Sequence, residues 1–201
     1  MTEKRCLILL TYLAVLSGGA LVGAAVSGRM GERRQGEKGM SDNFITVDHV
    51  RRTTGKPFED VTAAFERELG RFEPGVYKAL AAGGDAEGAR ARLEGMAGPS
   101  GFMLFASHNH GALLRLAGQQ RKAVQYVVGN PLFALQMTQH DIRASLYAPL
   151  RVLIYDDERG RTCLEYDKPS SLFGQFNDNK IAPVAAMLDK KLEALVAAAI
   201  K

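Results

Sequence analysis

The pattern of apolar positions divides the chain after residue 43 into short strands and helices of uneven length. Five segments alternate between apolar and polar residues or are apolar throughout, as short strands are: residues 44–51, 102–107, 122–128, 150–155 and 161–166. The last two are separated by residues 156–160 (DDERG), whose acidic residues and glycine predict a tight turn. We therefore expect these two strands to pair as an antiparallel hairpin.

Helical periodicity fills most of the remaining chain. Phe58, Val61 and Phe65 fall on one face of a helix that Pro57 opens and Gly70 ends. Shorter helices are predicted at residues 112–117 and 132–139, and a long closing helix at residues 182–200. Residues 73–99 are rich in alanine and glycine, which predicts a helical insertion of two short helices broken at residues 83–84.

About five strands, a hairpin and helices of uneven length predict a single α+β domain over residues 44–201. Strict alternation of strand and helix fails at the 156–160 turn, so a doubly wound parallel sheet is not expected. The predicted sheet is mostly antiparallel and packed by helices.

The amino-terminal residues have a different pattern. Residues 7–28 carry no charge, and as a helix they would extend about 33 Å at ~1.5 Å per residue, close to the ~30 Å hydrocarbon core of a bilayer. Two interpretations stay open: an uncleaved transmembrane anchor, or a signal peptide cleaved near Ala20 or Ala25, where the residues become small. A buried core helix is a third, weaker alternative. Residues 29–43 are predicted to form a polar linker.

Two opposed indications bear on the side of the membrane where the body of the chain lies. Lysine and arginine are more frequent after residue 28 than before residue 7, which favours a cytoplasmic body by the positive-inside rule. A start that resembles a signal peptide favours export. We expect a membrane-anchored protein whose body is periplasmic or otherwise extracytoplasmic.

Composition and charge exclude several classes of protein. Of 201 residues, 46% are hydrophobic and 24% charged, as in a folded domain. Twenty-six basic against twenty-two acidic side chains leave a net charge of +4, with the basic residues dispersed, so we expect no nucleic-acid partner. Two cysteines are too few for a disulfide scaffold or a four-cysteine zinc site, and Cys163 is expected to be a small buried side chain.

No catalytic constellation appears in the sequence. It lacks the serine elbow, the phosphate-binding loop, the glycine-rich dinucleotide fingerprint and the zinc-protease helix motif. We therefore assign no catalytic residue and expect a non-catalytic domain.

The histidines offer one alternative, a haem- or metal-binding redox module. His108 and His110 are two residues apart and project to one side if the strand continues through them. His140 and Met137 lie at the end of a predicted helix, and histidine with methionine suits haem iron or copper. The simpler interpretation is that residues 107–111 form a polar turn between a strand and a helix.

Two other segments predict a small-ligand site. Gly129 permits close backbone approach, Asn130 offers a donor and an acceptor, and Pro131 fixes the start of a helix. Tyr166 and Ser170 have hydrogen-bonding groups that would suit a pocket mouth. Each segment also has a purely structural interpretation, a strand-to-helix corner and a serine helix cap, respectively.

An ordered set of motifs resembles the bacterial domain-of-unknown-function 302 family. The set consists of residues 127–131 (VVGNP), 146–154 (LYAPLRVLI), Gly160 and residues 166–169 (YDKP). The likeness is good over residues 102–201 and loose over residues 44–70. It implies an α+β fold of the TATA-binding-protein-like type and a homodimer, and it supplies no reaction. Where it places cysteines in many relatives, this chain has Gly129 and Leu150, which argues against thiol chemistry here.

Overall fold

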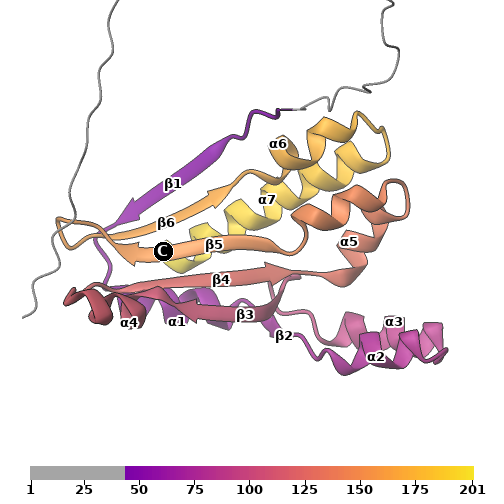
Figure 1. Cartoon of the computed structure of the whole chain (residues 1–201), viewed down its shortest axis with the longest axis horizontal. Helices are drawn as coiled ribbons and strands as arrows, with labels where there is room; N and C mark the ends of the chain where they lie inside the picture. Colours follow the sequence, from indigo (N-terminus) through magenta and orange to yellow (C-terminus); the bar gives the residue numbers. More distant parts are fainter. Residues whose placement is uncertain (1–43) are drawn as a thin grey trace, which may run out of the picture. The chain divides into compact units, whose positions relative to one another are not determined.

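The computed structural model describes residues 44–201, and a six-stranded sheet forms its centre (Figure 1). The strands are β1 (His49–Thr54), β2 (Gly70–Arg71), β3 (Met103–Asn109), β4 (Ala123–Gly129), β5 (Leu150–Asp156) and β6 (Thr162–Asp167). Their order across the sheet is β1-β6-β5-β4-β3-β2. Every pair is antiparallel except β2 with β3, which is parallel. The fold is therefore α+β with a mixed, mostly antiparallel sheet.

Within residues 44–201, seven α-helices and three short 3₁₀-helices lie between the strands and after the last strand. The α-helices are α1 (Phe58–Arg67), α2 (Gly75–Ala81), α3 (Ala86–Gly95), α4 (His110–Leu114), α5 (Pro131–Thr138), α6 (Pro169–Phe173) and α7 (Ile181–Ile200). The 3₁₀-helices are η1 (Arg115–Ala117), η2 (Ile142–Tyr147) and η3 (Gly174–Phe176). The prediction of two short helices with a break at residues 83–84 is confirmed by α2 and α3. Whether they are an insertion stays a prediction.

One face of the sheet is covered by helices and carries the core. Alternate residues of β5, among them Val152 and Ile154, are fully buried beneath α1 and α7. The rings of Phe65 on α1 and Tyr126 on β4 lie 5.0 Å apart. Burial of each such large side chain contributes about 1.5–3 kcal/mol. The long closing helix exists because its apolar positions recur at helical spacing and all meet this face.

The hairpin of β5 and β6 is confirmed. Val152 pairs with Tyr166 and Asp156 pairs with Thr162. The turn between them forms because the Asp157 carboxylate accepts hydrogen bonds from the backbone N–H groups of Arg159 and Arg161, each at 2.9 Å. Gly160 supplies the positive φ of 71° that the turn requires.

The strand register defines two ends of the sheet. At one end His49 pairs with Asp167, and the last residues of β4 pair with the first of β5. Helices α5 and α6 follow β4 and β6 there, so we name it the α5 end. At the opposite end Thr54 pairs with Thr162, and the β5–β6 turn and α4 lie there. We name this the hairpin end.

Two predictions about the strands are corrected. The first strand was expected at residues 44–51 but comprises His49–Thr54. Its pairing with β6 begins at His49 and continues through the polar residues Arg51 to Thr54. The strand β2 was not predicted, because two residues carry no periodic signal. Its backbone continues to Phe72, whose N–H donates to the Leu104 carbonyl oxygen at 3.2 Å.

The predicted membrane segment, residues 7–28, and the predicted linker, residues 29–43, lie outside the described residues. Among residues 44–201, no helix combines the length and the apolar composition that crossing a bilayer requires.

Candidate functional site

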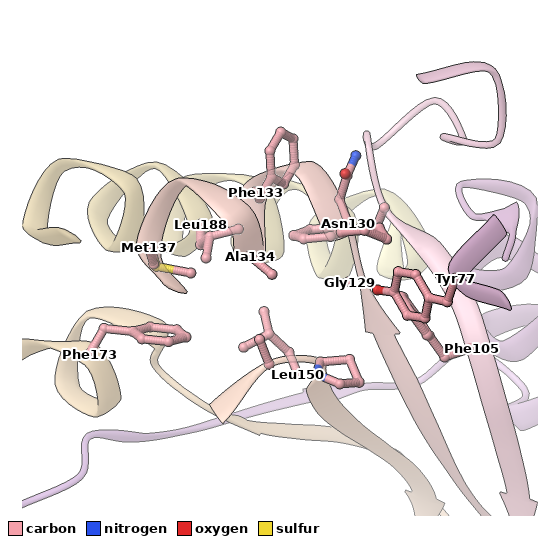
Figure 2. Close-up of a pocket in the computed structure, with 14 residues that line it drawn as sticks. Tyr77, Phe105, Gly129, Asn130, Phe133, Ala134, Met137, Leu150, Phe173 and Leu188 are labelled. Carbon is pink, nitrogen blue, oxygen red and sulfur yellow. The ribbon is translucent and has the colours of Figure 1, made fainter. Parts of the chain in front are cut away.

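A small apolar pocket lies at the α5 end of the sheet, with a volume of about 60 Å³. Its lining residues come from β3, β4 and β5, from the helices α2, α5, α6 and α7, and from the adjoining loops, and Figure 2 shows them around the pocket. The lining residues are Tyr77, Phe102, Phe105, Gly129, Asn130, Pro131, Phe133, Ala134, Met137, Ala148, Pro149, Leu150, Phe173 and Leu188. Thirteen of these fourteen residues are apolar or aromatic, and this composition is typical of a site for an apolar ligand.

The walls of the pocket come from elements far apart in the sequence. Met137 and Ala134 on α5 face Leu150 at the start of β5, and Phe173 on α6 closes one side (Figure 2). Met137 is almost fully buried, so it belongs to the rigid core as well as to the pocket. Its flexible thioether is well suited to a surface that adapts to different ligand shapes.

An aromatic cluster closes the other side. Phe72 stacks on Phe105 with ring centroids 4.3 Å apart, and it contacts Tyr77 at 5.1 Å. Tyr77 comes from α2 and is 49% exposed, so it separates the pocket from solvent. Partial burial raises the pKa of its hydroxyl above the ordinary value, which keeps the group neutral and able to donate a hydrogen bond. Sequence reasoning missed Tyr77, because only long-range packing brings α2 to this site.

The predicted Gly129-Asn130-Pro131 segment lines the pocket, and the structure explains each residue. A side chain at Gly129 would place its Cβ 3.2 Å from Cβ of Pro149, so the close approach that glycine permits here is to Pro149. The Asn130 amide donates to the Gly101 carbonyl oxygen at 2.9 Å, and its oxygen accepts from the Leu132 N–H at 2.8 Å. Asn130 is therefore the N-cap of α5, with Pro131 in the first turn.

The two positions at which the resembled family has cysteines in many members both lie at this pocket. This chain has Gly129 and Leu150 there, and both residues line the pocket. They are held close by the pairing of Val128 with Leu150 between β4 and β5. Side chains at these two positions therefore shape the same small cavity.

The other two predicted ligand residues lie elsewhere. Tyr166 is buried on the helix-covered face of β6 and is not among the residues that line this pocket, so the structure does not bring it together with Asn130 there. Ser170 belongs to α6, and its backbone N–H donates to the Asp189 carboxylate at 2.8 Å. The alternative of a serine cap is corrected, because the N-cap of α6 is Lys168, which makes no side-chain cap hydrogen bond. The Ser171 hydroxyl instead donates to the Lys168 carbonyl oxygen and accepts from the Asp48 N–H.

The histidines do not form one site. His108 and His110 lie at the hairpin end with ring centroids 6.4 Å apart, whereas His140 follows α5 at the opposite end. Met137 is turned into the core. Within residues 44–201, no three histidine, cysteine or acidic side chains are arranged to hold a metal ion. The Asn109 side chain accepts from the Ala112 N–H at 2.8 Å, as expected for a polar strand-to-helix turn.

A polar cluster on the face of the sheet opposite α1 and α7 was not anticipated. Glu165 lies at its centre: it accepts from the Tyr155 hydroxyl at 2.5 Å, from Arg51 at 3.2 Å and from His49 at 3.1 Å. Hydrogen bonds to Asp167 and Glu165 raise the pKa of His49. These groups satisfy one another across β1, β5 and β6, so the cluster ties the edge strand β1 to the sheet.

Cys163 lies beneath this cluster and is fully buried, as expected from the sequence. Its Sγ accepts from the Arg51 guanidinium at 3.4 Å and lies 3.5 Å from the Thr53 hydroxyl. The thiol is covered on every side and does not face the pocket.

The fold and the pocket together define the class: an α+β domain with helices on one face of a mostly antiparallel sheet and an apolar pocket at one sheet end. The family model described as "Domain of unknown function DUF302" matches residues 78–199, and the chain belongs to this family. This confirms the resemblance seen in the sequence.

A solved structure supports the same fold. The chain is similar to the uncharacterized conserved protein DUF302 from Bacillus stearothermophilus, with a TM-score of 0.53 and 18% sequence identity. The similarity covers 75% of this chain and 97% of that one. No curated protein sequence matches the chain.

Proposed function

We propose that the chain is a membrane-tethered, non-catalytic binding domain. Its ligand is a small apolar molecule, or the apolar end of a larger one, held in the pocket between β4, β5, α5 and α6. The observation that carries this proposal is the pocket itself: thirteen apolar or aromatic residues line free volume beside a core, where close packing leaves few voids.

The volume limits the ligand. About 60 Å³ equals the share of roughly two water molecules in the liquid, and is less than half of a ~150 Å³ apolar cavity that accepts benzene. The resting pocket therefore fits the tip of an alkyl chain. A longer apolar group fits if Tyr77, at the solvent side, turns outward.

The polar groups of the lining bear on whether the site binds its ligand or converts it. Its polar side chains are those of Asn130 and Tyr77, and the Asn130 amide is already engaged at both ends. Apart from the Tyr77 hydroxyl, the fourteen lining residues offer no side chain of the kinds that act as general acids, general bases or nucleophiles. This composition supports binding without turnover, with the Tyr77 hydroxyl as the group that meets one polar atom of the ligand.

A series of linear alcohols tests the site. We expect alcohols from ethanol to hexanol to stabilise the full chain against thermal unfolding, with affinity rising about fourfold for each added methylene until the pocket is full. Ala134→Leu fills the pocket and abolishes this dependence on chain length. Ala186→Leu makes the same change on the exposed side of α7 and should retain it. An identical response of all three proteins would overturn the proposal.

Tethering and assembly are further parts of the proposal. Residues 7–28 hold the chain in the membrane, residues 29–43 link them to the domain, and the body lies in the periplasm or another extracytoplasmic space. Residues 44–201 have a fold of the TATA-binding-protein-like type and assemble as a homodimer, the two properties that the family resemblance implies. An alkaline phosphatase fusion after residue 41 tests the location, because this reporter is active only after export. Sedimentation equilibrium of the full chain tests the dimer.

A further inference from the structure

Three large apolar side chains lie exposed together at the α5 end of the domain. Leu135 on α5 is 43% exposed, and Ile142 and Leu146, four residues apart on η2, are 74% and 79% exposed. Helix α5 packs against η2, and we name these three exposed residues the apolar patch. Single exposed leucines are common on soluble proteins, whereas a group of such residues marks a surface that contacts an apolar partner.

The amino-terminal part of the chain joins the domain at the same end. The first strand begins at His49, which pairs with Asp167 immediately before α6. Just before the strand, Asp48 is fixed to the start of α6 by two hydrogen bonds, its carbonyl oxygen accepting from the Lys168 N–H at 2.8 Å and its N–H donating to the Ser171 hydroxyl at 3.0 Å. Helix α6 in turn contacts η2, which carries Ile142 and Leu146.

The pocket lies at this end too. Helix α5 carries Leu135 on its exposed side and Ala134 and Met137 on the side that lines the pocket. One short helix therefore separates the exposed apolar patch from the apolar interior. The attachment of the amino-terminal segment, the patch and the pocket are three separate features, and they coincide at the α5 end of the sheet.

We infer that the α5 end of the domain lies on the phospholipid bilayer, with Ile142 and Leu146 in its interfacial layer, and that the pocket receives an acyl chain end or another apolar molecule from that surface. This inference rests on the proposed tether, since the chain enters the domain beside α6 at this end. Short helices with exposed large apolar residues insert in this way into the boundary between headgroups and acyl chains.

The hairpin end offers the matched comparison. Leu116 on η1 is 87% exposed, comparable to the 79% exposure of Leu146. It lies beyond the other end of β4, whose seven residues extend about 23 Å at ~3.3 Å each. A residue at this end is held away from a bilayer that contacts the α5 end. Leu113, three residues before Leu116, is also exposed, at 61%. Both ends of the sheet therefore carry exposed leucines, and the ends differ in that the amino-terminal segment joins the domain at the α5 end.

The experiment uses the full chain reconstituted in phosphatidylcholine and phosphatidylglycerol vesicles. The sequence contains no tryptophan, so Leu146→Trp and Leu116→Trp each introduce a single fluorophore. In vesicles, we expect the emission of Leu146→Trp to shift to shorter wavelength and to lose most of its intensity when the acyl chains are brominated. Leu116→Trp should keep the emission of a water-exposed indole with either lipid. Both positions are exposed, so neither substitution disturbs the core.

Each other outcome has a distinct meaning. If the chain does not co-sediment with vesicles, the tether and this inference both fail. If it co-sediments but bromination quenches neither fluorophore, or quenches both equally, the tether stands and the inference is overturned. A blue shift of Leu146→Trp that depends on protein concentration and resists bromination would show that a second copy of the chain covers the patch, which also overturns it.

Discussion

Asn130 and Gly101 are joined by a hydrogen bond of 2.9 Å from the Asn130 amide to the Gly101 carbonyl oxygen. The same side chain caps α5 through the Leu132 N–H. One residue thus connects the turn before β3 to the helix that forms the pocket wall. The shape of the pocket depends on this connection, because α5 supplies Ala134 and Met137 to the lining.

Replacement of Asn130 should therefore destabilise the domain. Asn130→Ala removes the cap, worth about 0.5–2 kcal/mol, and the hydrogen bond to Gly101, worth about 1 kcal/mol, for a total loss of about 2 kcal/mol in the free energy of unfolding. Asn130→Ser keeps a capping oxygen and should lose about half as much. Urea denaturation measures both values.

The control for this prediction is Asn109, which caps the short, exposed helix α4 by one hydrogen bond of 2.8 Å. Asn109→Ala should cost less than about 1 kcal/mol. Equal losses for Asn109→Ala and Asn130→Ala would mean that the Gly101 contact contributes nothing.

His49 should make stability depend on pH. Its ring lies 2.9 Å from Asp167 and 3.1 Å from Glu165, and the pKa of His49 is raised above the ordinary 6.5. A pKa raised in the folded state adds stability that is complete below pH 6.5 and is lost as the pH rises through the folded value. The side chain is half exposed, so the contribution is below about 1 kcal/mol.

The comparison of the wild type with His49→Gln measures this effect. The difference in free energy of unfolding should be largest in mildly acidic solution and should shrink as the pH rises above 6.5. His140→Gln removes an exposed histidine at the same end of the sheet and serves as the control. A difference that is constant with pH would contradict the prediction.

Asp157 in the β5–β6 turn should make stability depend on pH in the direction opposite to His49. The backbone N–H and the guanidinium of Arg161 lower the pKa of Asp157 from 3.8 to about 2. A lowered pKa adds stability that is present above pH 3.8 and is lost as the pH falls toward 2. The advantage of the wild type over Asp157→Asn should therefore disappear over this range. Glu158→Gln, in the same turn, should leave the acid dependence unchanged.

The thiol of Cys163 should be unreactive in the folded protein. It is fully buried beneath Arg51 and Thr53, so a thiol reagent reaches it only when β1 or the whole domain opens. In a Cys6→Ser background, we expect modification by Ellman's reagent to be at least about 100-fold slower than in denaturant, since an opening that costs ~3 kcal/mol reduces the rate by that factor. Gln119→Cys supplies an exposed thiol for comparison. Rapid modification of Cys163 would show that β1 is only loosely held.

Several elements of the fold were predictable because their residues interact locally. The β5–β6 hairpin was correct because the acidic turn, its glycine and two alternating strands lie within eighteen residues. The predicted bounds of β1 were wrong because this strand lies at the sheet edge. Its residues Arg51 and Thr53 face the polar cluster rather than a core, so they do not show the alternation of a half-buried strand. Strand β2 was missed because its pairing with β3 depends on a contact distant in the sequence.

The pocket was predictable only in part, for the same reason. Gly129, Asn130 and Pro131 stood out because glycine, asparagine and proline have distinct backbone roles. The remaining lining residues are ordinary apolar side chains, which no local pattern separates from the core. Tyr166 was predicted at the site because Pro169, three residues later, suggested a pocket mouth, whereas the strand register turns Tyr166 toward the helices and outside the lining of this pocket.

The most direct test of the central claim, that the pocket binds an apolar ligand, is methyl NMR of methionine-labelled protein titrated with hexanol. Met137 lines the pocket, and Met187 on α7 packs against the core without contacting the pocket. Loss of one signal in Met137→Leu and of another in Met187→Leu assigns the two methyl groups. We expect the Met137 methyl signal to shift saturably while that of Met187 stays unchanged. A Met137 signal that does not move, or two signals that move alike without saturation, would contradict the account.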